Sequence, residues 1–158
     1  MVSEDAFRTV MGNFAAGVTV VTLPEPLHGI TVNAFTSVSA DPPLVLICID
    51  HGTETYDRLE SGTEEFCVNV LAGDQRHLGE HFARIAEHGD PFVEEPIRTE
   101  ETGAPVFEEA LDYLDCTVAD TLEAGDHTIY VGAVEAADVL QEGEGALTYF
   151  GGEWGTIG

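Results

Sequence analysis

The sequence contains no lysine: its five basic residues are all arginine, against 30 aspartates and glutamates. The formal net charge of −25 over 158 residues would repel nucleic acid and anionic membranes, so we expect neither as a partner. The acidic residues are scattered along the chain rather than gathered in a tail. Two explanations stay open: adaptation to high salt, as in salt-accumulating halophiles, and an acidic face for a basic partner. The first predicts loss of structure at low ionic strength.

Long apolar runs and paired cysteines are also missing. No run approaches the length needed to span a bilayer, and the first ten residues are acidic where a secretory signal would be basic. We therefore expect a cytoplasmic protein. Cys48, Cys67 and Cys116 are odd in number, widely spaced and flanked by apolar residues. This pattern predicts buried thiols rather than disulfides or zinc ligands, with a catalytic cysteine as the alternative.

Several common catalytic and phosphate-binding motifs are absent. No G-x-G-x-x-G follows a strand, and neither a P-loop nor a G-x-S-x-G elbow occurs. The stretch "HLGEH" from His77 to His81 matches the H-x-x-E-H zinc pattern, but Gly79 interrupts it and no third ligand is identifiable. A solvated helix face explains the spacing, so we predict no metal site.

The remaining pattern predicts one mainly β domain over residues 1–158. Helical spacing and caps indicate short helices within 3–17, 53–62 and 74–85, and residues 86–110 read as a surface loop. Apolar and alternating stretches predict six or seven strands, which do not alternate with helices as βαβ units would. This order favours a predominantly antiparallel barrel with two or three peripheral helices.

The stretch "GITVNAFTSVSADPP" gathers hydroxyls in a β segment that ends at two prolines. After the next strand, "IDHGTET" places Thr53 and Thr55 where a helix begins. Hydroxyls, backbone amides and a helix N-terminus can hold a phosphate without lysine, but a half-exposed strand explains the composition as well. Further along, Gly125 and Asp126 form a predicted hairpin turn that presents His127, which is otherwise an ordinary turn histidine.

Five blocks, in chain order, resemble the flavin reductase-like family of FMN-binding split barrels. They are "FRTVMGNFAAGVTVVT", "GITVNAFTSVSADPPLVLICID", "FCVNVLAGDQRHLGEHFA", "GDHTIYVGAV" and "ALTYFGGEWG", and together they cover nearly the whole chain. The resemblance implies a six-stranded antiparallel split barrel that forms a homodimer, with the flavin in a groove near the subunit interface.

The resemblance also implies roles for individual residues. His127 would contact the nicotinamide as the one residue assigned to the reaction. The residues expected to bind the flavin are Asn33, Ala34, Phe35, Thr36, Ser37, Ser39, Asp50, His51, Thr53, Thr55, Phe82 and Ala83. Among these, the segment from Asn33 would line the ring and ribityl chain, and Ser39 and the Asp50–Thr55 turn would approach the phosphate. Arg58 is the nearest candidate cation, with an exposed helix arginine as the alternative, and Trp154 would stack on a ring or cap the barrel.

The implied activity is hydride transfer from NADH or NADPH to FMN, with FAD possible, by a flavin reductase that supplies a partner oxygenase or another acceptor. The alternative within the family is an electron-carrying FMN protein that keeps its flavin and exchanges electrons with a protein partner. A third possibility, from another class, is an acidic interaction module with a degenerate site. The sequence does not distinguish FMN from FAD, or NADH from NADPH.

Overall fold

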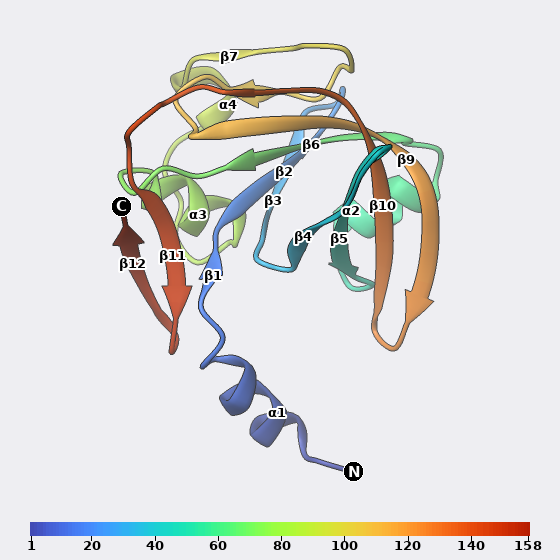
Figure 1. The fold of residues 1–158 in the computed structure, drawn as a ribbon, viewed down its shortest axis with the longest axis vertical. Helices are drawn as coiled ribbons and strands as arrows, with labels where there is room; N and C mark the ends of the chain where they lie inside the picture. Colours follow the sequence, from blue (N-terminus) through green and yellow to red (C-terminus); the bar gives the residue numbers. More distant parts are fainter.

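The computed structural model describes residues 1–158 as a curled, mainly β body with one projecting helix (Figure 1). The helices are α1 (Glu4–Met11), α2 (Glu54–Glu60), α3 (Arg76–Phe82) and α4 (Pro91–Glu94). The strands are β1 (Ala16–Gly17), β2 (Thr19–Leu23), β3 (His28–Val32), β4 (Phe35–Ala40), β5 (Pro43–Asp50), β6 (Glu65–Val70), β7 (Ile97–Arg98), β8 (Val106–Phe107), β9 (Asp112–Ala124), β10 (His127–Val139), β11 (Ala146–Phe150) and β12 (Glu153–Ile157).

The main sheet has seven strands in the order β3-β2-β6-β9-β10-β5-β4, and all neighbouring pairs are antiparallel. The predicted fold class is therefore confirmed, whereas the prediction of six strands was one too few for this sheet. Small sheets of β1-β11-β12 and β7-β8 add further strands. Among these, β1, β7 and β8 were missed because they have only two residues each, too few for a periodic pattern. The region 86–110, expected to be a loop, likewise contains α4 and the β7–β8 pair.

The sheet curls around a core to which β2 contributes on both faces. Val21 and Leu23 pack into the cluster inside the barrel, with Ile47 of β5 and Phe66 of β6. Val20 points the other way, into a second cluster that contains Leu78 and Phe82 of α3. Side chains alternate along a strand, so this double burial requires the continuous apolar run seen in "VTVVTL". Helix α3 is thereby held against the outside of β2.

The barrel remains open between β3 and the end of β5. Strand β3 is an edge of the sheet, and the pairing of β4 with β5 stops at Ile47. Residues Cys48–Asp50 of β5 therefore extend past β4, although the Cys48 N–H still donates to the Ala34 carbonyl over 3.0 Å. The opening matters for function because the backbone groups at a free strand edge can bind a ligand.

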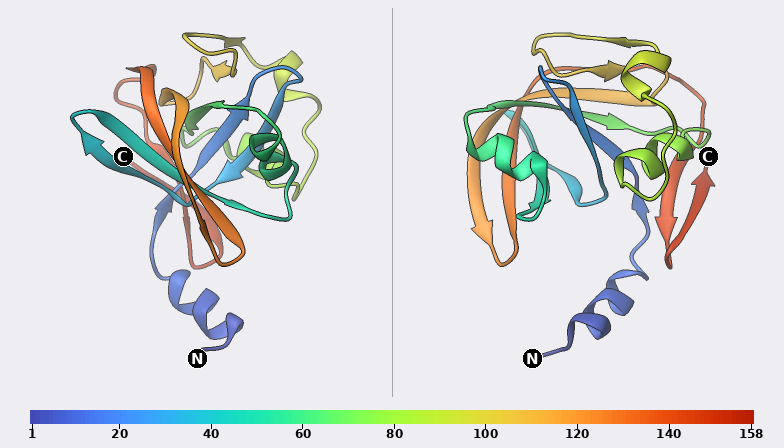
Figure 2. Two further views of the ribbon diagram at one scale, coloured as in Figure 1. Left: turned by 90° about the vertical axis from the view of Figure 1, so that its right-hand side faces the viewer. Right: turned by 180° about the vertical axis from the view of Figure 1, so that it is seen from behind.

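Helix α1 projects away from the rest of the molecule in all three views (Figures 1 and 2). Ser3, the first residue of the predicted segment 3–17, caps it, since its hydroxyl accepts from the Ala6 N–H at 3.1 Å. The helix ends earlier than the predicted segment, at Met11, and none of its residues is buried. A helix this short is marginal alone in water, and this one places its apolar side in solvent.

Helix α3 is fixed to β3 and to the C-terminal hairpin. The Thr31 hydroxyl donates to the Gly79 carbonyl over 2.6 Å. A Cβ at Gly79 would lie 2.8 Å from the Trp154 ring, so the glycine allows the indole of β12 to pack directly on the helix. Trp154 also lies at 5.2 Å from the Tyr149 ring, which makes it a cap on the barrel end rather than a groove residue. The helix stops at Phe82, short of the end of the predicted segment 74–85, and Ile85 is 63% exposed.

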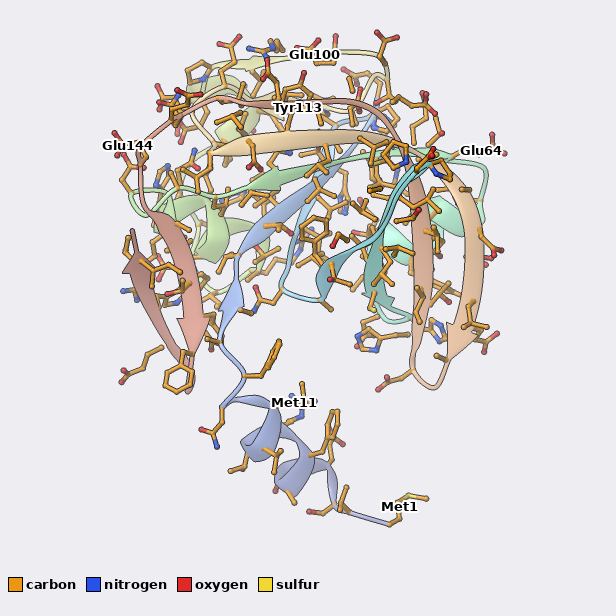
Figure 3. All side chains as sticks on the ribbon, viewed as in Figure 1. Met1, Met11, Glu64, Glu100, Tyr113 and Glu144 are labelled. Carbon is orange, nitrogen blue, oxygen red and sulfur yellow. The ribbon has the colours of Figure 1, made fainter.

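Apart from the buried Asp115, the acidic residues lie over the outside of the body, as the labelled Glu64, Glu100 and Glu144 illustrate (Figure 3). Cys67 and Cys116 are buried and Cys48 is half-buried, and all three are free thiols. Burial raises the pKa of Cys116 to about 12. No helix in the structure has the length and apolar character needed to cross a membrane.

Candidate functional site

A groove made of four adjoining cavities follows the opening of the barrel. Cavity A, of about 530 Å³, lies between α1 and the Asn33–Thr36 segment. Cavity B, of about 190 Å³, lies between β3 and Cys48–Asp50 of β5 and includes His127. Cavity C, of about 420 Å³, lies between β3 and the 52–55 turn. Cavity D, of about 460 Å³, lies beyond it, between β3 and residues 84–87.

Shared residues show that these cavities are continuous. Asn33 and Ala34 line both A and B, and Ile30 and Thr31 line both B and C. Cavities C and D share His28, Phe82 and Arg84. The groove is therefore a single path that changes from apolar at cavity A to polar and cationic around Arg84.

Most of the predicted site residues line this path. Cavity A includes Phe35 and Thr36, and cavity B includes Asp50 and His127. The other members that line the groove are Asn33, Ala34, Thr53, Thr55, Phe82 and Ala83. Residues from β3, β5, α2, α3 and β10 thus converge, although they come from separate parts of the chain.

Three predicted residues do not line the groove: Ser37, Ser39 and His51. The register of β4 against β5 shifts between Ser37 and Ser39, so the simple alternation assumed from the sequence does not apply there. His51 is turned toward β10, where its Nε2 lies 2.9 Å from the Thr128 hydroxyl. The structure therefore does not bring these three side chains to the site.

The two threonines of the turn have structural partners of their own. The Thr53 hydroxyl accepts from the Tyr56 N–H and donates to the Asp50 carbonyl at 2.8 Å, which caps α2 as predicted. Thr55 is fully buried and its hydroxyl lies 2.7 Å from Nε2 of His28. The backbone N–H groups of residues 54 and 55 have no acceptor within the chain. At this point the groove therefore offers backbone amides rather than the two hydroxyls expected.

His127 is positioned by the β9–β10 hairpin. It opens β10 opposite Asp50 of β5, and its Nδ1 donates to Oδ1 of Asp126 over 2.7 Å. That hydrogen bond is the main reason why the pKa of the exposed Asp126 is lowered. The bond orients the imidazole and leaves Nε2 free for another partner. Asp50, Asp126 and His127 have potential metal-ligand atoms within 4.8 Å of one another. Asp50, however, already accepts from the Gly52 N–H in the turn, and Asp126 accepts from His127 in the hairpin.

Arg84 is the residue that sequence reasoning missed. It lines both C and D, and it forms no ion pair with a carboxylate, in contrast to Arg8, Arg76 and Arg98. Its φ of 59° is the only positive value outside glycine, and it lies in the left-handed region that residues with a Cβ rarely adopt. The signal available in the sequence was its place directly after "HFA", since a residue that follows a helix end can turn back toward the groove.

Arg58, the cation considered from the sequence, has another task. Its guanidinium donates to the carbonyls of Pro24 and Pro26, at 2.7 Å and 2.5 Å. These bonds hold the turn between β2 and β3 against α2. Arg58 therefore stabilises this turn, outside the groove, and does not act as the exposed helix arginine considered from the sequence.

His28 lies at the floor of C and D and is buried. Its Nδ1 lies 2.8 Å from a Glu54 carboxylate oxygen, and its Nε2 accepts from the Thr55 hydroxyl. Burial lowers the pKa of His28 despite the opposing effect of Glu54. The neutral imidazole therefore uses both nitrogens to connect β3 with the start of α2.

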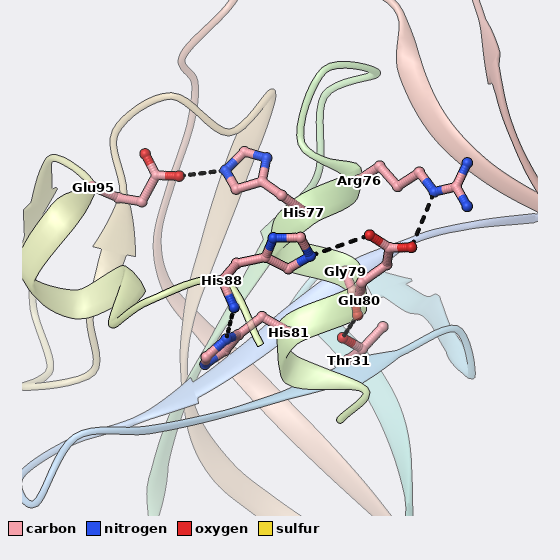
Figure 4. Close-up of polar contacts among 8 residues, drawn as sticks. All are labelled: Thr31, Arg76, His77, Gly79, Glu80, His81, His88 and Glu95. Carbon is pink, nitrogen blue, oxygen red and sulfur yellow. Dashed lines mark hydrogen bonds and ion pairs between the residues drawn. The ribbon is translucent and has the colours of Figure 1, made fainter. Parts of the chain in front are cut away.

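The three histidines around α3 do not gather as zinc ligands (Figure 4). His77 contacts Glu95 at 2.5 Å, and His88 contacts Glu80 at 3.2 Å. Nδ1 of His81 accepts the backbone N–H of His88 at 3.2 Å. These contacts hold the segment after α3 against the helix. The residues that matched the zinc pattern, His77, Glu80 and His81, therefore have hydrogen-bond partners within the chain.

Comparison with known proteins gives a consistent result. The family model described as "Flavin reductase like domain" matches residues 11–158. The chain is 44% identical over 137 residues to a Rhodococcus "NADH-dependent flavin reductase", covering 81% of this chain and 73% of the relative. It is 37% identical over 132 residues to "Flavin-dependent monooxygenase, reductase subunit HsaB" of Mycobacterium tuberculosis, covering 82% and 69%.

The match to a Rhizobium meliloti "Probable flavin reductase" is 40% identical over 134 residues and covers 83% of this chain. This chain spans only 42% of the length of that relative. Among solved structures, "Flavin reductase PheA2 in native state" has a TM-score of 0.90 at 33% identity and covers 99% of both chains.

Proposed function

Because the chain belongs to the flavin reductase like family, we propose that it is an NADH-dependent flavin reductase whose groove holds a flavin beside the dinucleotide. The observation that carries the proposal is the continuity of cavities A to C with Arg84 at the polar end. The groove offers an apolar section for a ring system and a cationic section for a phosphate. This order matches FMN, in which the isoalloxazine ring lies at one end and the phosphate at the other.

The apolar section fits the isoalloxazine ring. Cavity A and cavity B meet at Asn33, Ala34 and Cys48, next to the free edge of β3. Backbone groups at this edge and the Asn33 amide can satisfy the polar rim of the ring, while Phe35 and Leu46 offer apolar contact. We assign Thr36 to the same section and leave Ser37, Ser39 and His51 out of the binding set.

The cationic section fits the phosphate of FMN. In a chain with net charge −25, an anion is bound only where local positive charge exceeds the general repulsion. Arg84 provides that charge, and the free N–H groups of residues 54 and 55 provide donors close by. His28 stays neutral and keeps Glu54 drawn toward β3.

Hydride transfer between a nicotinamide and a flavin is the chemistry of the bound groups themselves. The protein has to align the two reactants and needs no proton-shuttling triad. His127, held by Asp126, is placed in cavity B to hydrogen-bond the nicotinamide through Nε2.

We further propose that the reduced flavin leaves the groove and serves a partner oxygenase, as the name of the Mycobacterium relative says of that protein. The groove is open along one side of the barrel, which suits exchange of the flavin. The dispersed acids and the absence of lysine are best explained by work at high salt, where self-repulsion is screened.

A homodimer would complete the groove. Phe7, Val10, Met11 and Phe14 are 57%, 67%, 48% and 73% exposed. Phe7, Met11 and Phe14 also line cavity A, so a second copy packed on α1 would cover both the helix and the ring section. Without a second copy this apolar surface is exposed to water, because no residue of α1 is buried.

The test is a titration of the protein with FMN in molar salt, followed by NADH oxidation with excess free FMN. Quenched flavin fluorescence and many turnovers per protein support the proposal. A tightly bound yellow protein that does not turn over free FMN indicates the electron-carrying alternative. A colourless protein that leaves FMN fluorescence unchanged rejects flavin binding altogether.

A further inference from the structure

Cavity C contains an acidic side chain, although it is the cavity that we assign to the phosphate. Glu54 and Arg84 are the two charged residues in its lining, beside the neutral His28. We propose that Glu54, held in place by His28, weakens the binding of the flavin phosphate to Arg84 and thereby sets how quickly the flavin leaves the groove. This inference rests on the proposed function and names the residue that makes its bound flavin exchangeable.

The Glu54 carboxylate is held by one contact. Nδ1 of His28 donates to its Oε2 over 2.8 Å, and no other hydrogen bond or ion pair within the chain involves this carboxylate. The Glu54 side chain is 67% exposed, whereas that of His28 is 7% exposed. The charge of Glu54 therefore faces the groove, and its position depends on a donor that is itself fixed in the groove floor.

His28 is fixed at its other nitrogen as well. Its Nε2 accepts from the hydroxyl of the fully buried Thr55 at 2.7 Å. Because both nitrogens are used, the ring cannot turn away from Glu54 without losing a buried hydrogen bond. His28 is accordingly the positioning residue for the carboxylate.

Arg84 has no carboxylate partner while Glu54 stays on His28. Its guanidinium donates to the Phe82 carbonyl at 3.0 Å and forms no ion pair, although Glu54 lines the same cavity. A carboxylate and a phosphate present the same kind of oxygen acceptor to a guanidinium. The contact with His28 thus leaves the N–H groups of Arg84 to a phosphate, with a second negative charge close by.

The second charge acts on the bound flavin more than on its approach. Exposed charges that lie more than about 3 Å apart are largely screened at molar salt, so the long-range repulsion of an incoming anion is small. A phosphate bound to Arg84 shares cavity C with Glu54, where less solvent separates the two anions. Repulsion within the cavity therefore persists and shortens the time for which the flavin stays bound.

His28 limits the strength of this effect. Without its Nδ1 donor, the carboxylate is free to turn toward Arg84 and form the ion pair that the structure lacks. Such a pair would neutralise the cation, and the groove would lose more of its affinity for a phosphate. The arrangement keeps Arg84 available, while the charge of Glu54 keeps the phosphate weakly bound.

The experiment compares wild type with Glu54→Gln, His28→Gln and the double variant. Asp57→Asn is the matched control, because Asp57 is the other acidic residue in the first turn of α2 and lines none of the four cavities. Fluorescence quenching in molar salt measures the Kd of FMN and of riboflavin. Stopped-flow dilution, in which released FMN regains its fluorescence, measures the dissociation rate. Riboflavin, which has no phosphate, reports whether the groove of each variant is intact.

We expect Glu54→Gln to bind FMN about two- to fivefold more tightly, the range for one partly exposed charge pair, with a dissociation rate lower by the same factor. His28→Gln should bind FMN more weakly, and the double variant should match Glu54→Gln, because His28 acts through the carboxylate. Asp57→Asn should behave as wild type, and the Kd of riboflavin should be the same in all five proteins. If His28→Gln loses riboflavin as well, its groove is damaged, and the comparison of Glu54→Gln with Asp57→Asn decides the question.

The inference is overturned if Glu54→Gln binds FMN no more tightly than Asp57→Asn does, or if the gain lies only in the association rate. An equal gain for FMN and riboflavin also overturns it, because the effect would then not involve the phosphate. Failure of the proposed function gives a different result: no protein, wild type included, quenches either flavin, and the inference falls with it.

Discussion

Nε2 of the buried His28 lies 2.7 Å from the Thr55 hydroxyl, which joins β3 to the first turn of α2 beneath the groove. The contact connects residues that lie 27 positions apart and gives the Thr55 hydroxyl an internal partner. With Nδ1 directed at the Glu54 carboxylate, the neutral imidazole accepts at Nε2, whereas a protonated ring would require the Thr55 hydroxyl to turn and accept instead. Burial opposes that protonation because it lowers the pKa of His28, so the groove floor is sensitive to pH.

This sensitivity can be measured as stability. Burial lowers the pKa of His28 below its ordinary 6.5, so the unfolded chain takes up a proton before the folded one does. The contribution of His28 to stability is therefore fully present above pH 6.5 and is lost as the pH falls below it, by at most about 1.4 kcal/mol per pH unit. We expect thermal unfolding in molar salt to show a smaller loss of stability from pH 7.5 to 5.5 in His28→Gln than in wild type. His77→Gln controls for the loss of one histidine, and equal slopes in all three proteins would contradict the prediction.

Removing the charge of Arg84 tests the phosphate end. Arg84→Gln should weaken FMN binding about tenfold or more, because a hydrogen bond to a charged group contributes about 1.5–3 kcal/mol. Riboflavin, which has no phosphate, should bind the variant and wild type equally. Arg76→Gln is the matched control, since it removes the same charge from α3 outside the groove. Fluorescence quenching at one salt concentration measures the Kd of FMN and of riboflavin. An equal loss of affinity for the two would contradict the assignment of Arg84 to the phosphate.

His127→Ala should separate the two substrates. We expect the KM for NADH to rise about three- to tenfold, the effect of one lost hydrogen bond, with the Kd of FMN within twofold of wild type. His77→Ala, which alters a histidine away from the groove, should change neither. Equal losses for NADH and FMN would refute the assignment of His127 to the nicotinamide.

Cys48 reports on the flavin position without an activity assay. It is the only cysteine not fully buried, it lines cavities A and B, and burial still raises its pKa. We therefore expect slow reaction with N-ethylmaleimide in the native protein, slowed about tenfold more by FMN at ten times its Kd. Mass spectrometry after digestion measures the labelling, and Cys48→Ser should take up no label while folded. Labelling of Cys48 at the same rate with and without FMN would show that the ring lies elsewhere.

The exposed face of α1 predicts the oligomeric state. Phe14→Asp should weaken a dimer by about 10- to 100-fold, since a buried phenylalanine contributes roughly 1.5–3 kcal/mol. Thr9→Asp, on α1 but outside the apolar set of Phe7, Val10, Met11 and the following Phe14, should have little effect. Light scattering across a concentration series measures the mass. A wild-type chain that remains monomeric at high concentration would rule out the proposed dimer.

The amino-acid sequence determined the features that depend on neighbours along the chain. The caps at Ser3 and Thr53, the hairpin turn before His127 and the apolar course of β5 are local consequences of side-chain chemistry and side-chain alternation. The five ordered blocks likewise sufficed to indicate the family, because several matching blocks in chain order are far more specific than any one of them. The class of fold and most residues of the groove followed from these signals.

Only the tertiary structure decided which polar groups remain available to a ligand. Arg58 and Arg84 look alike in the sequence, but the first is bound to two proline carbonyls of a distant turn and the second is left facing two cavities. The Thr55 hydroxyl is taken by His28, and Ser37 and Ser39 of β4 do not line the groove. Such partners are chosen when the sheet curls and brings β3 close to β5, because a hydrogen bond between distant segments depends on that closure and not on local spacing.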